Sequence, residues 1–507
     1  MAELTFPHYL FRNGRATATI WILAVITGLL AAILPVEWIM VALAGATVLT
    51  LAAVQPLLVL AIALVAAPFG ALESVILGGL SIDSGQILLG VALAGWIGRG
   101  LVQRQLKVPR SSLLPPLLIF VFLACVSLLN APDLILGLKE VLKWVEIILI
   151  MMMVTDLAQD WHGKDGIWAI AFMLLMSGLV QATIGIWQFG LRGDGPEHFL
   201  VLERYYRAYG TFEQPNPYGG FMNLNALLAL GILMALFSDW LLGMMGRRPA
   251  GADSLRSGWG MLLFFSAIGV AAFASILGLI FSWSRGAWMG FLAGLASMVV
   301  LWPRRTRYGL ASLGVAGLLG LAMWQVGLVP TTVESRISSF TSDLTLGDVR
   351  GVDINDANYA VLERVAHWQA ALDMARDHLW LGVGFGNYGA AYPNYALLNW
   401  PDALGHAHNY YLNLFAELGL LGLIAYLIAW MTIFWQTYRV LRRERTAVRG
   451  IALGLMGIWV ALSVHHLVDK LYVNNIYIHL GVLLGLLQLA DLHAASGEQV
   501  GEIEAGR

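Results

Sequence analysis

Charged residues are scarce in this chain. Of its 507 residues only 12% are charged and 59% are hydrophobic, whereas a typical soluble domain carries about 25% charged residues. A soluble chain of this length would divide into several domains, each of which needs a polar surface. The shortage of charge excludes that organisation and indicates a membrane protein.

Two further shortages narrow the function. The chain has one cysteine, Cys125, inside an apolar run, which excludes an intrachain disulfide and any cysteine-based metal site. It also has no excess of basic residues, because 30 Lys and Arg are balanced by 32 Asp and Glu, which gives a net charge of −2. Without a basic surface, nucleic acid is not expected among the partners.

Long apolar runs are what the sequence has in abundance. A helix needs roughly 20 such residues to cross a bilayer. The runs are 18–34, 38–54, 56–70, 84–98, 112–129, 133–154, 166–190, 216–237, 258–283, 286–302, 308–328, 410–437, 450–466 and 473–490. They predict an all-α polytopic membrane protein with about 12–14 transmembrane helices. The lower count applies if 38–54 and 56–70 form one hairpin that dips into the bilayer.

The distribution of Lys and Arg orients these helices, because cytoplasmic loops hold the excess of both. With the N-terminus inside, the inside loops collect most of the cations and both termini are cytoplasmic. The short outside loops then hold only Arg192, Arg204, Arg207, Arg285 and Lys470. This topology divides the chain into a bundle at 1–328, a long extracytoplasmic loop at 329–409, further helices at 410–490 and a cytoplasmic tail at 491–507.

The extracytoplasmic loop is too long to be a simple connection. Within it, 359–380 has apolar residues at helical spacing, which predicts an amphipathic helix at the outer membrane face or against the bundle. A Gly-rich and aromatic stretch follows at 382–395. Its GxGxG pattern is not a dinucleotide fingerprint, since no strand precedes it.

Two arginine motifs converge on the outer side. YYRAYGTFEQPNPYGG (205–220) places Arg207 just before a turn that opens a span, and FSWSRGAWMG (281–290) places Arg285 at the turn of a helical hairpin. Arginine is a planar, permanently charged donor that binds a diphosphate bidentately. The alternative is that each arginine reaches lipid headgroups or caps a helix.

A histidine motif, GHAHNYYLNLFAELGLLG (405–422), lies where the long loop re-enters the membrane. His408 begins the helix, and the positive end of the helix dipole disfavours imidazolium, which keeps a neutral proton acceptor available. Gly419 and Gly422 lie on the same helical face and would let a neighbouring helix approach. The alternative is that His408 merely hydrogen-bonds its own loop. Its polar neighbours His406 and Asn409 favour a functional site instead.

Other charges fall inside or beside the predicted spans. Lys139, Glu140, Lys143 and Glu146 share one helix, where Lys143 either holds a phosphate or is neutralised by a neighbouring glutamate. Glu417 lies deeper on the re-entering helix and is expected to hydrogen-bond inside the bundle. The last outside turn carries residues that either line an acceptor entrance or face water: His465, His466, Asp469 and Lys470.

These motifs carry a family resemblance. The His408-Asn409 pair, followed by Gly-Leu-Leu-Gly at 419–422, resembles the signature of the O-antigen ligase and polymerase family. The Arg207 turn, the SRGAW element around Arg285 and the stretch 363–388 extend the resemblance, which covers roughly 200–430. It implies a GT-C-like helical glycosyltransferase that needs no cofactor. Such an enzyme moves a glycan from an undecaprenyl diphosphate carrier to an acceptor, outside the bacterial cytoplasmic membrane.

The resemblance also implies roles for individual residues. Arg207 and Arg285 would bind the diphosphate. Lys143 is added to this donor set because of its charge inside a predicted span, and not because of the resemblance. His408 would take the proton from the acceptor hydroxyl as it attacks, which inverts the anomeric centre. A supporting set is expected around them: His406 as an assistant, and Asn409, Gly419, Gly422, Glu417 and Arg364 as structural residues. No metal is expected, because the chain has no Asp-x-Asp motif.

The sequence does not identify the acceptor, because a lipid, a glycan or a protein would each supply a hydroxyl. Ligase and polymerase also share these motifs. The alternative class is a flippase or transporter of lipid-linked oligosaccharide, which should show repeated halves or charges at the membrane midplane. A membrane scaffold is a third possibility, but it leaves the placement of the arginines and histidines unexplained.

Overall fold

The computed structural model describes residues 35–77, 80–104, 109–159, 161, 164–245, 259–329, 349–355, 358–444 and 447–505. The first predicted span, 18–34, lies outside the described residues. So do most of the polar stretch 331–358 and residues 506–507 of the predicted tail.

Almost all of the described chain is helical. The long helices of the bundle are α2 (Val36–Val54), α3 (Pro56–Ala66), α5 (Ser84–Gln103), α6 (Leu114–Ser127), α7 (Leu134–Ala158), α8 (Asp165–Gly190), α9 (Pro215–Met244), α10 (Trp259–Phe281), α11 (Arg285–Leu301), α12 (Thr306–Gln325), α16 (Tyr410–Arg443), α17 (Val448–His465) and α18 (Ile476–Ala505). Within the described residues, 10 helices are long and apolar enough to cross a membrane, and α6 and α11 are shorter apolar helices. The predicted all-α polytopic membrane fold is confirmed.

The 19-residue helix α14 and several short elements occupy the connections. They are α4 (Gly70–Glu73), α14 (Tyr359–Asp377), α15 (Tyr388–Ala391), the 3-10 turns η2 (Ala67–Phe69), η3 (Leu128–Asn130), η4 (Glu197–Phe199) and η5 (Tyr392–Asn394), and the strands β1 (Val75–Leu77), β2 (Leu80–Ile82), β3 (Leu200–Val201) and β4 (Tyr205–Tyr206). The strands form two antiparallel hairpins, in which Val75 pairs with Ile82 and Leu200 with Tyr206.

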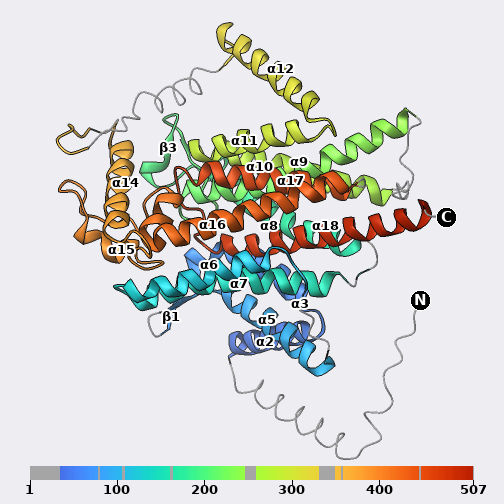
Figure 1. Ribbon diagram of the computed structural model, residues 1–507, viewed down its shortest axis with the longest axis horizontal. Coiled ribbons are helices and arrows are strands. Elements are labelled where there is room, and N and C mark those ends of the chain that lie inside the picture. The colour runs from blue at the N-terminus through green and yellow to red at the C-terminus, as the bar shows by residue number, and fades with distance from the viewer. Residues whose placement is uncertain are drawn as a thin grey trace, which may run out of the picture.

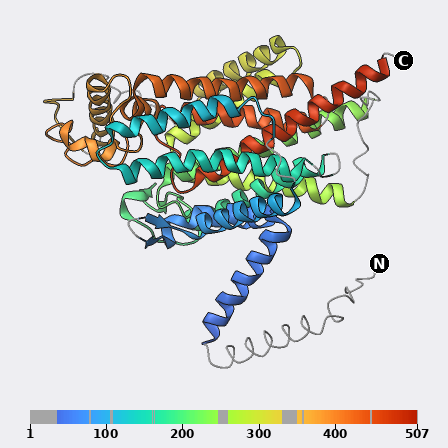
Figure 2. The same cartoon turned by 60° about the horizontal axis from the view of Figure 1, so that its bottom comes forward.

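Most of the long helices run side by side along one axis, and α14 lies across one end of the bundle (Figure 1). The C-terminus lies at the opposite end, and α2 diverges from the bundle in the second view (Figure 2). The buried face of α14 carries Val361, Leu362 and Val365, which pack in a small cluster with Trp400. This helix falls within the range predicted to be amphipathic. We call this end of the bundle the α14 end.

The centre of the bundle is built on close helix approaches. A Cβ at Gly231 of α9 would lie 2.4 Å from the backbone nitrogen of Gly454 in α17, and a Cβ at Gly294 of α11 would lie 2.6 Å from the carbonyl oxygen of Gly457. Small residues allow this spacing in membrane helices, where dispersion contacts drive association. Helix α17 is therefore fixed between α9 and α11, and so is the segment 466–475 that leaves its end.

Helix α16 is interrupted at Gly419, whose φ is 64° and ψ is −165°. The loop before α16 pairs with the broken turn: the Leu420 amide donates to the Leu379 carbonyl at 2.8 Å, and the Val383 amide donates to the Ala416 carbonyl at 2.9 Å. The sequence predicted an unbroken helical face that another helix approaches. The structure differs because a loop approaches instead, and its carbonyl and amide groups satisfy the backbone that the break exposes.

Substituting Gly419 by alanine should destabilise the protein by about 1–3 kcal/mol. The φ of 64° is unfavourable for an L side chain, and a Cβ would lie 2.4 Å from the backbone carbon of Trp380. A matched control is Gly314→Ala in α12, where no atom lies within 4 Å of the Cβ position. Thermal unfolding in detergent measures both. Equal melting temperatures for the two variants would contradict the strain argument.

Candidate active site

A cavity of about 230 Å³ is lined in part by α14 and so lies at the α14 end. Three arginines reach it from separate segments: Arg207 from the loop before α9, Arg285 from the first turn of α11, and Arg364 from α14. We call it the arginine cavity. Its other lining residues are Asn216, Trp283, Ser284, Gly286, Met289, Val361, Val365, Trp368, His465, Val468 and Asp469.

Arg207 is held by the connection between α10 and α11. Its Nε donates to the Ser282 carbonyl at 2.9 Å, and its Nη2 lies 3.4 Å from Asn216 Oδ1. Its guanidinium carbon lies 5.9 Å from the centre of the Phe199 ring. These contacts join the β3–β4 hairpin to the α10–α11 turn, so the two arginine motifs of the sequence form one wall.

Arg285 starts α11 directly after the N-cap residue Ser284, whose Oγ accepts from the Ala287 amide. The adjacent Gly286 allows the helix to touch His465, because a Cβ there would lie 2.8 Å from the imidazole. The amides and the positive dipole end of a helix N-terminus favour an anion. The guanidinium of Arg285 and the N-terminus of α11 therefore favour an anion at the same point.

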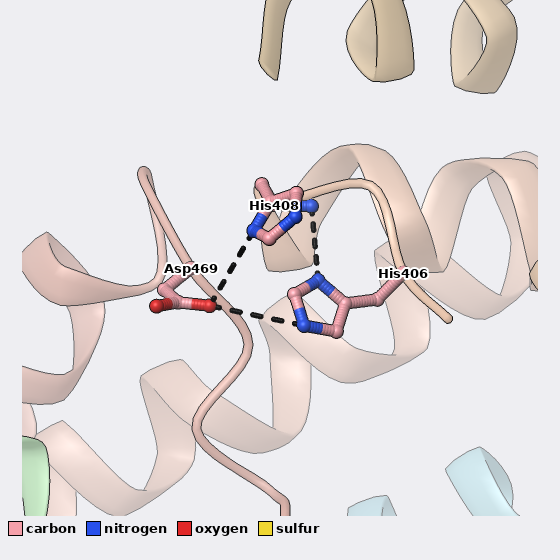
Figure 3. A group of neighbouring side chains, drawn as sticks. All are labelled: His406, His408 and Asp469. Carbon is pink, nitrogen blue, oxygen red and sulfur yellow. Dashed lines mark hydrogen bonds and ion pairs between the residues drawn. The ribbon is translucent and has the colours of Figure 1, made fainter. Parts of the chain in front are cut away.

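Two histidines and an aspartate form a cluster beside this cavity (Figure 3). His406 Nε2 and His408 Nδ1 each lie 3.9 Å from Asp469 Oδ1. That is too long for a hydrogen bond, and within the described chain neither ring nitrogen of His408 has a hydrogen-bond partner. The His408 amide donates to His406 Nδ1 at 3.1 Å. His408 thus carries an available proton acceptor next to a carboxylate.

The backbone fixes the position of this cluster. His408 has a φ of 50°, and the next residue, Asn409, caps α16 through an Oδ1 that accepts from the Tyr411 and Leu412 amides at 3.1 Å each. The Tyr410 amide donates to the His466 carbonyl at 2.8 Å. The start of α16 is thereby tied to the segment that carries Asp469.

The charges of the cluster follow from its surroundings. Burial, together with the neighbouring His408, lowers the pKa of His406 to about 3. Burial by itself would raise the pKa of Asp469, but the neighbouring imidazoles of His408 and His406 bring it below its usual range. At neutral pH the cluster therefore holds a neutral His406 and an ionised Asp469.

Asp469 belongs to both parts of the site, since it lines the arginine cavity and faces the histidines. A wall that carries three arginines is thus next to a pair of histidines. The ligand atoms of His406, His408 and Asp469 lie within 4.8 Å of one another, so these three residues could also hold a metal ion.

Comparison with protein families decides the assignment. Residues 270–427 match the family model described as O-antigen ligase. This segment is an O-antigen ligase domain. The resemblance to the O-antigen ligase and polymerase family is confirmed, and with it glycan transfer by a multi-pass membrane protein as the general activity. Among curated proteins none matches the chain.

The O-antigen ligase domain contains most of the predicted site residues. Arg285, Arg364, His406 and His408 fall inside the matched range, whereas Arg207 does not. Glu417 is buried within it, and its Oε1 accepts from the Tyr388 amide at 3.0 Å. Gly422 is buried against the side chain of Leu418. Asn409 caps α16 directly after His408, whereas Glu417 and the break at Gly419 join that helix to the loop 379–388.

Lys143 is not among the residues that line the arginine cavity. Its Nζ lies 2.6 Å from Glu140 Oε1, and both residues line a different cavity. Lys470 Nζ lies 3.6 Å from the same carboxylate. This contact with Glu140 matches the alternative that a glutamate neutralises Lys143.

Two residues of the candidate site were underestimated from the sequence. Arg364 was expected to be structural, but it lines the cavity together with Val361, Val365 and Trp368, which is the spacing of one helical face. Asp469 was left undecided, and the structure brings it to the histidines. The signal for Asp469 was its place in an outside turn that follows two histidines.

Proposed function

We propose that the protein catalyses an inverting, metal-independent transfer of a glycan from undecaprenyl diphosphate to an acceptor hydroxyl. The reaction takes place at the outer face of the bacterial cytoplasmic membrane, and both termini are cytoplasmic. The observation that carries the proposal is the position of Asp469, which joins a cavity with three arginines to a histidine pair. A leaving diphosphate needs the positive charge of the arginines, and an attacking hydroxyl needs a proton acceptor beside it.

The arginine cavity would bind the diphosphate of the donor. Arg207, Arg285 and Arg364 offer charged, forked donors that suit two phosphate groups. As the bond between the anomeric carbon and the diphosphate oxygen breaks, its electron pair moves to the diphosphate. Fixed positive charge stabilises this departing group without reorganisation.

His408 would act as the general base. It takes the proton of the acceptor hydroxyl while the oxygen attacks the anomeric carbon from the face opposite the diphosphate, so the configuration inverts. The Asp469 carboxylate, 3.9 Å from His408 Nδ1, stabilises the imidazolium that forms. His406 orients His408, because its Nδ1 accepts a hydrogen bond from the His408 amide.

The decisive experiment uses the purified full chain and a labelled undecaprenyl diphosphate oligosaccharide. Lipid, glycan and protein acceptors are offered in turn, and the products are analysed for the site and anomeric configuration of the new bond. We expect transfer to one acceptor class with inversion. Retention of configuration, or no transfer to any class, would overturn the proposal.

Chelation should leave the transfer rate unchanged. The three arginines of the cavity supply the positive charge that a metal supplies in other transferases. Added Zn²⁺ should inhibit, because His406, His408 and Asp469 offer a set of zinc ligands and an occupied His408 cannot accept a proton. Rates with EDTA and with added Zn²⁺ test both statements. A rate that EDTA abolishes and Mg²⁺ restores would contradict metal independence.

A further inference from the structure

His465 is the last residue of α17 and lines the arginine cavity. The sequence placed it either at an acceptor entrance or facing water, but the residue is only 1% exposed. Its Nδ1 has no hydrogen-bond partner in the described part of the chain. Buried polar atoms are normally paired, so this imidazole is expected to bind a molecule that enters the cavity.

Two glycines fix the place of the imidazole. A Cβ at Gly286 of α11 would lie 2.9 Å from His465 Nε2, and a Cβ at Gly220 of α9 would lie 3.3 Å from His465 Nδ1. Helix α17 approaches α11 again at Gly290, where a Cβ would lie 2.8 Å from the Ala461 carbonyl oxygen. Since the ring is held between packed helices, it is preorganised beside Arg285, the residue that precedes Gly286.

His465 lies on the side of the arginine cavity that borders the histidine cluster. The Val468 amide donates to the His465 carbonyl at 3.0 Å, and this turn leads to Asp469, which lines the cavity and faces His408. In the proposed reaction the bond between sugar and diphosphate breaks near His408, and therefore at this border. The phosphate that carries the sugar would then lie beside His465, and the lipid-linked phosphate farther from the border.

The chemistry of an imidazole suits this phosphate. In either charge state the ring keeps at least one N–H donor. As the bond to the anomeric carbon breaks, its electron pair moves to an oxygen of the sugar-bearing phosphate, and a hydrogen bond to this phosphate strengthens as negative charge accumulates. No proton has to leave His465. A donor on this side also offsets the repulsion that the Asp469 carboxylate exerts on the diphosphate.

We propose that His465 binds the sugar-bearing phosphate of the donor and stabilises it as it leaves. The inference rests on the proposed function. It adds a donor-binding residue that belongs to neither arginine motif and lies outside the matched range 270–427. The arginines attract the diphosphate as a whole, whereas His465 acts on the phosphate that is released from the sugar.

Binding of two sugar-free lipids tests this role. Undecaprenyl diphosphate carries both phosphates, whereas undecaprenyl monophosphate lacks the one assigned to His465. In nanodiscs, the full-length His465→Leu variant should bind the diphosphate about tenfold more weakly, the equivalent of about 1.4 kcal/mol, and the monophosphate normally. His465→Asn keeps an N–H donor and should recover part of the loss. With saturating donor, the transfer rate of His465→Leu should fall about 10²-fold, the effect of removing one preorganised donor.

The matched control is His466→Leu. His466 is equally buried, and neither of its ring nitrogens has a partner among the described residues. It packs against Tyr410 and Tyr472, with ring centres 4.8 Å apart in each pair, and is not part of the cavity lining. This control should bind both lipids normally.

Three results would overturn the inference: unchanged binding of the diphosphate by His465→Leu, equal losses for both lipids in that variant, or an equal loss of diphosphate binding in His466→Leu. The second and third would mean that the packing of α17, and not a contact with one phosphate, supports the cavity. If the unmodified enzyme bound neither lipid, the proposed function itself would fail.

Discussion

Replacing His408 by alanine should lower the rate of glycan transfer by about 10²–10⁴-fold, the usual contribution of a general base. Donor binding should be nearly unchanged, because His408 is not among the residues that line the arginine cavity. The transfer rate and donor binding respond differently because the imidazole acts on the acceptor proton and not on the diphosphate. Initial rates with the labelled donor, together with donor binding at equilibrium, measure the two quantities separately.

Two further variants sharpen this result. His198→Ala, at an exposed histidine of η4, should transfer at the normal rate. Asp469→Asn keeps the shape of the side chain but removes the charge 3.9 Å from His408 Nδ1, so its rate should fall between those of the other two. If His408→Ala retained normal transfer, the base would be a different residue and the proposed mechanism would be wrong.

Replacing Arg285 by alanine should weaken donor binding by about 10- to 100-fold, because a hydrogen bond to a charged group contributes about 1.5–3 kcal/mol. Arg285→Lys should recover part of the affinity, since lysine keeps the charge but lacks the planar fork. The measurement is equilibrium binding of the labelled donor. It is made with the enzyme in excess lipid and repeated at several salt concentrations.

Arg192 provides the control for this prediction. It is another arginine expected on the outer side, but it does not line the arginine cavity, and its Nε pairs with Asp194 at 2.6 Å. Arg192→Ala should bind the donor normally. Equal losses in Arg192→Ala and Arg285→Ala would mean that general surface charge, and not the cavity, attracts the donor.

The membrane fold and the two arginine motifs were predictable because each depends on local sequence. Apolar runs set the helices, and Arg207 and Arg285 were conspicuous because few cations remain for the outer side. The resemblance added the family and the role of His408. These inferences need no knowledge of which helices are neighbours.

The remaining features depend on contacts between distant segments. Asp469 joins His408 only because the α17 end packs beside the α16 start, through the Tyr410 amide and the His466 carbonyl. Gly419 was expected inside a regular helix, and its positive φ follows from the loop that pairs with it. Lys143 was assigned to the donor from its charge alone, whereas its distance to Glu140 is a matter of packing.

The place of Asp469 in the chain has a consequence for biosynthesis. The three arginines and both histidines of the cluster precede it in sequence, and it follows the penultimate long helix of the described chain. Chains are made and folded from the N-terminus. A nascent polypeptide that already contains Arg207, Arg285 and His408 therefore still lacks the carboxylate that lines the arginine cavity and faces His408. The candidate site is assembled only after α17 has been made, so its chemistry depends on one of the last described segments to be synthesised.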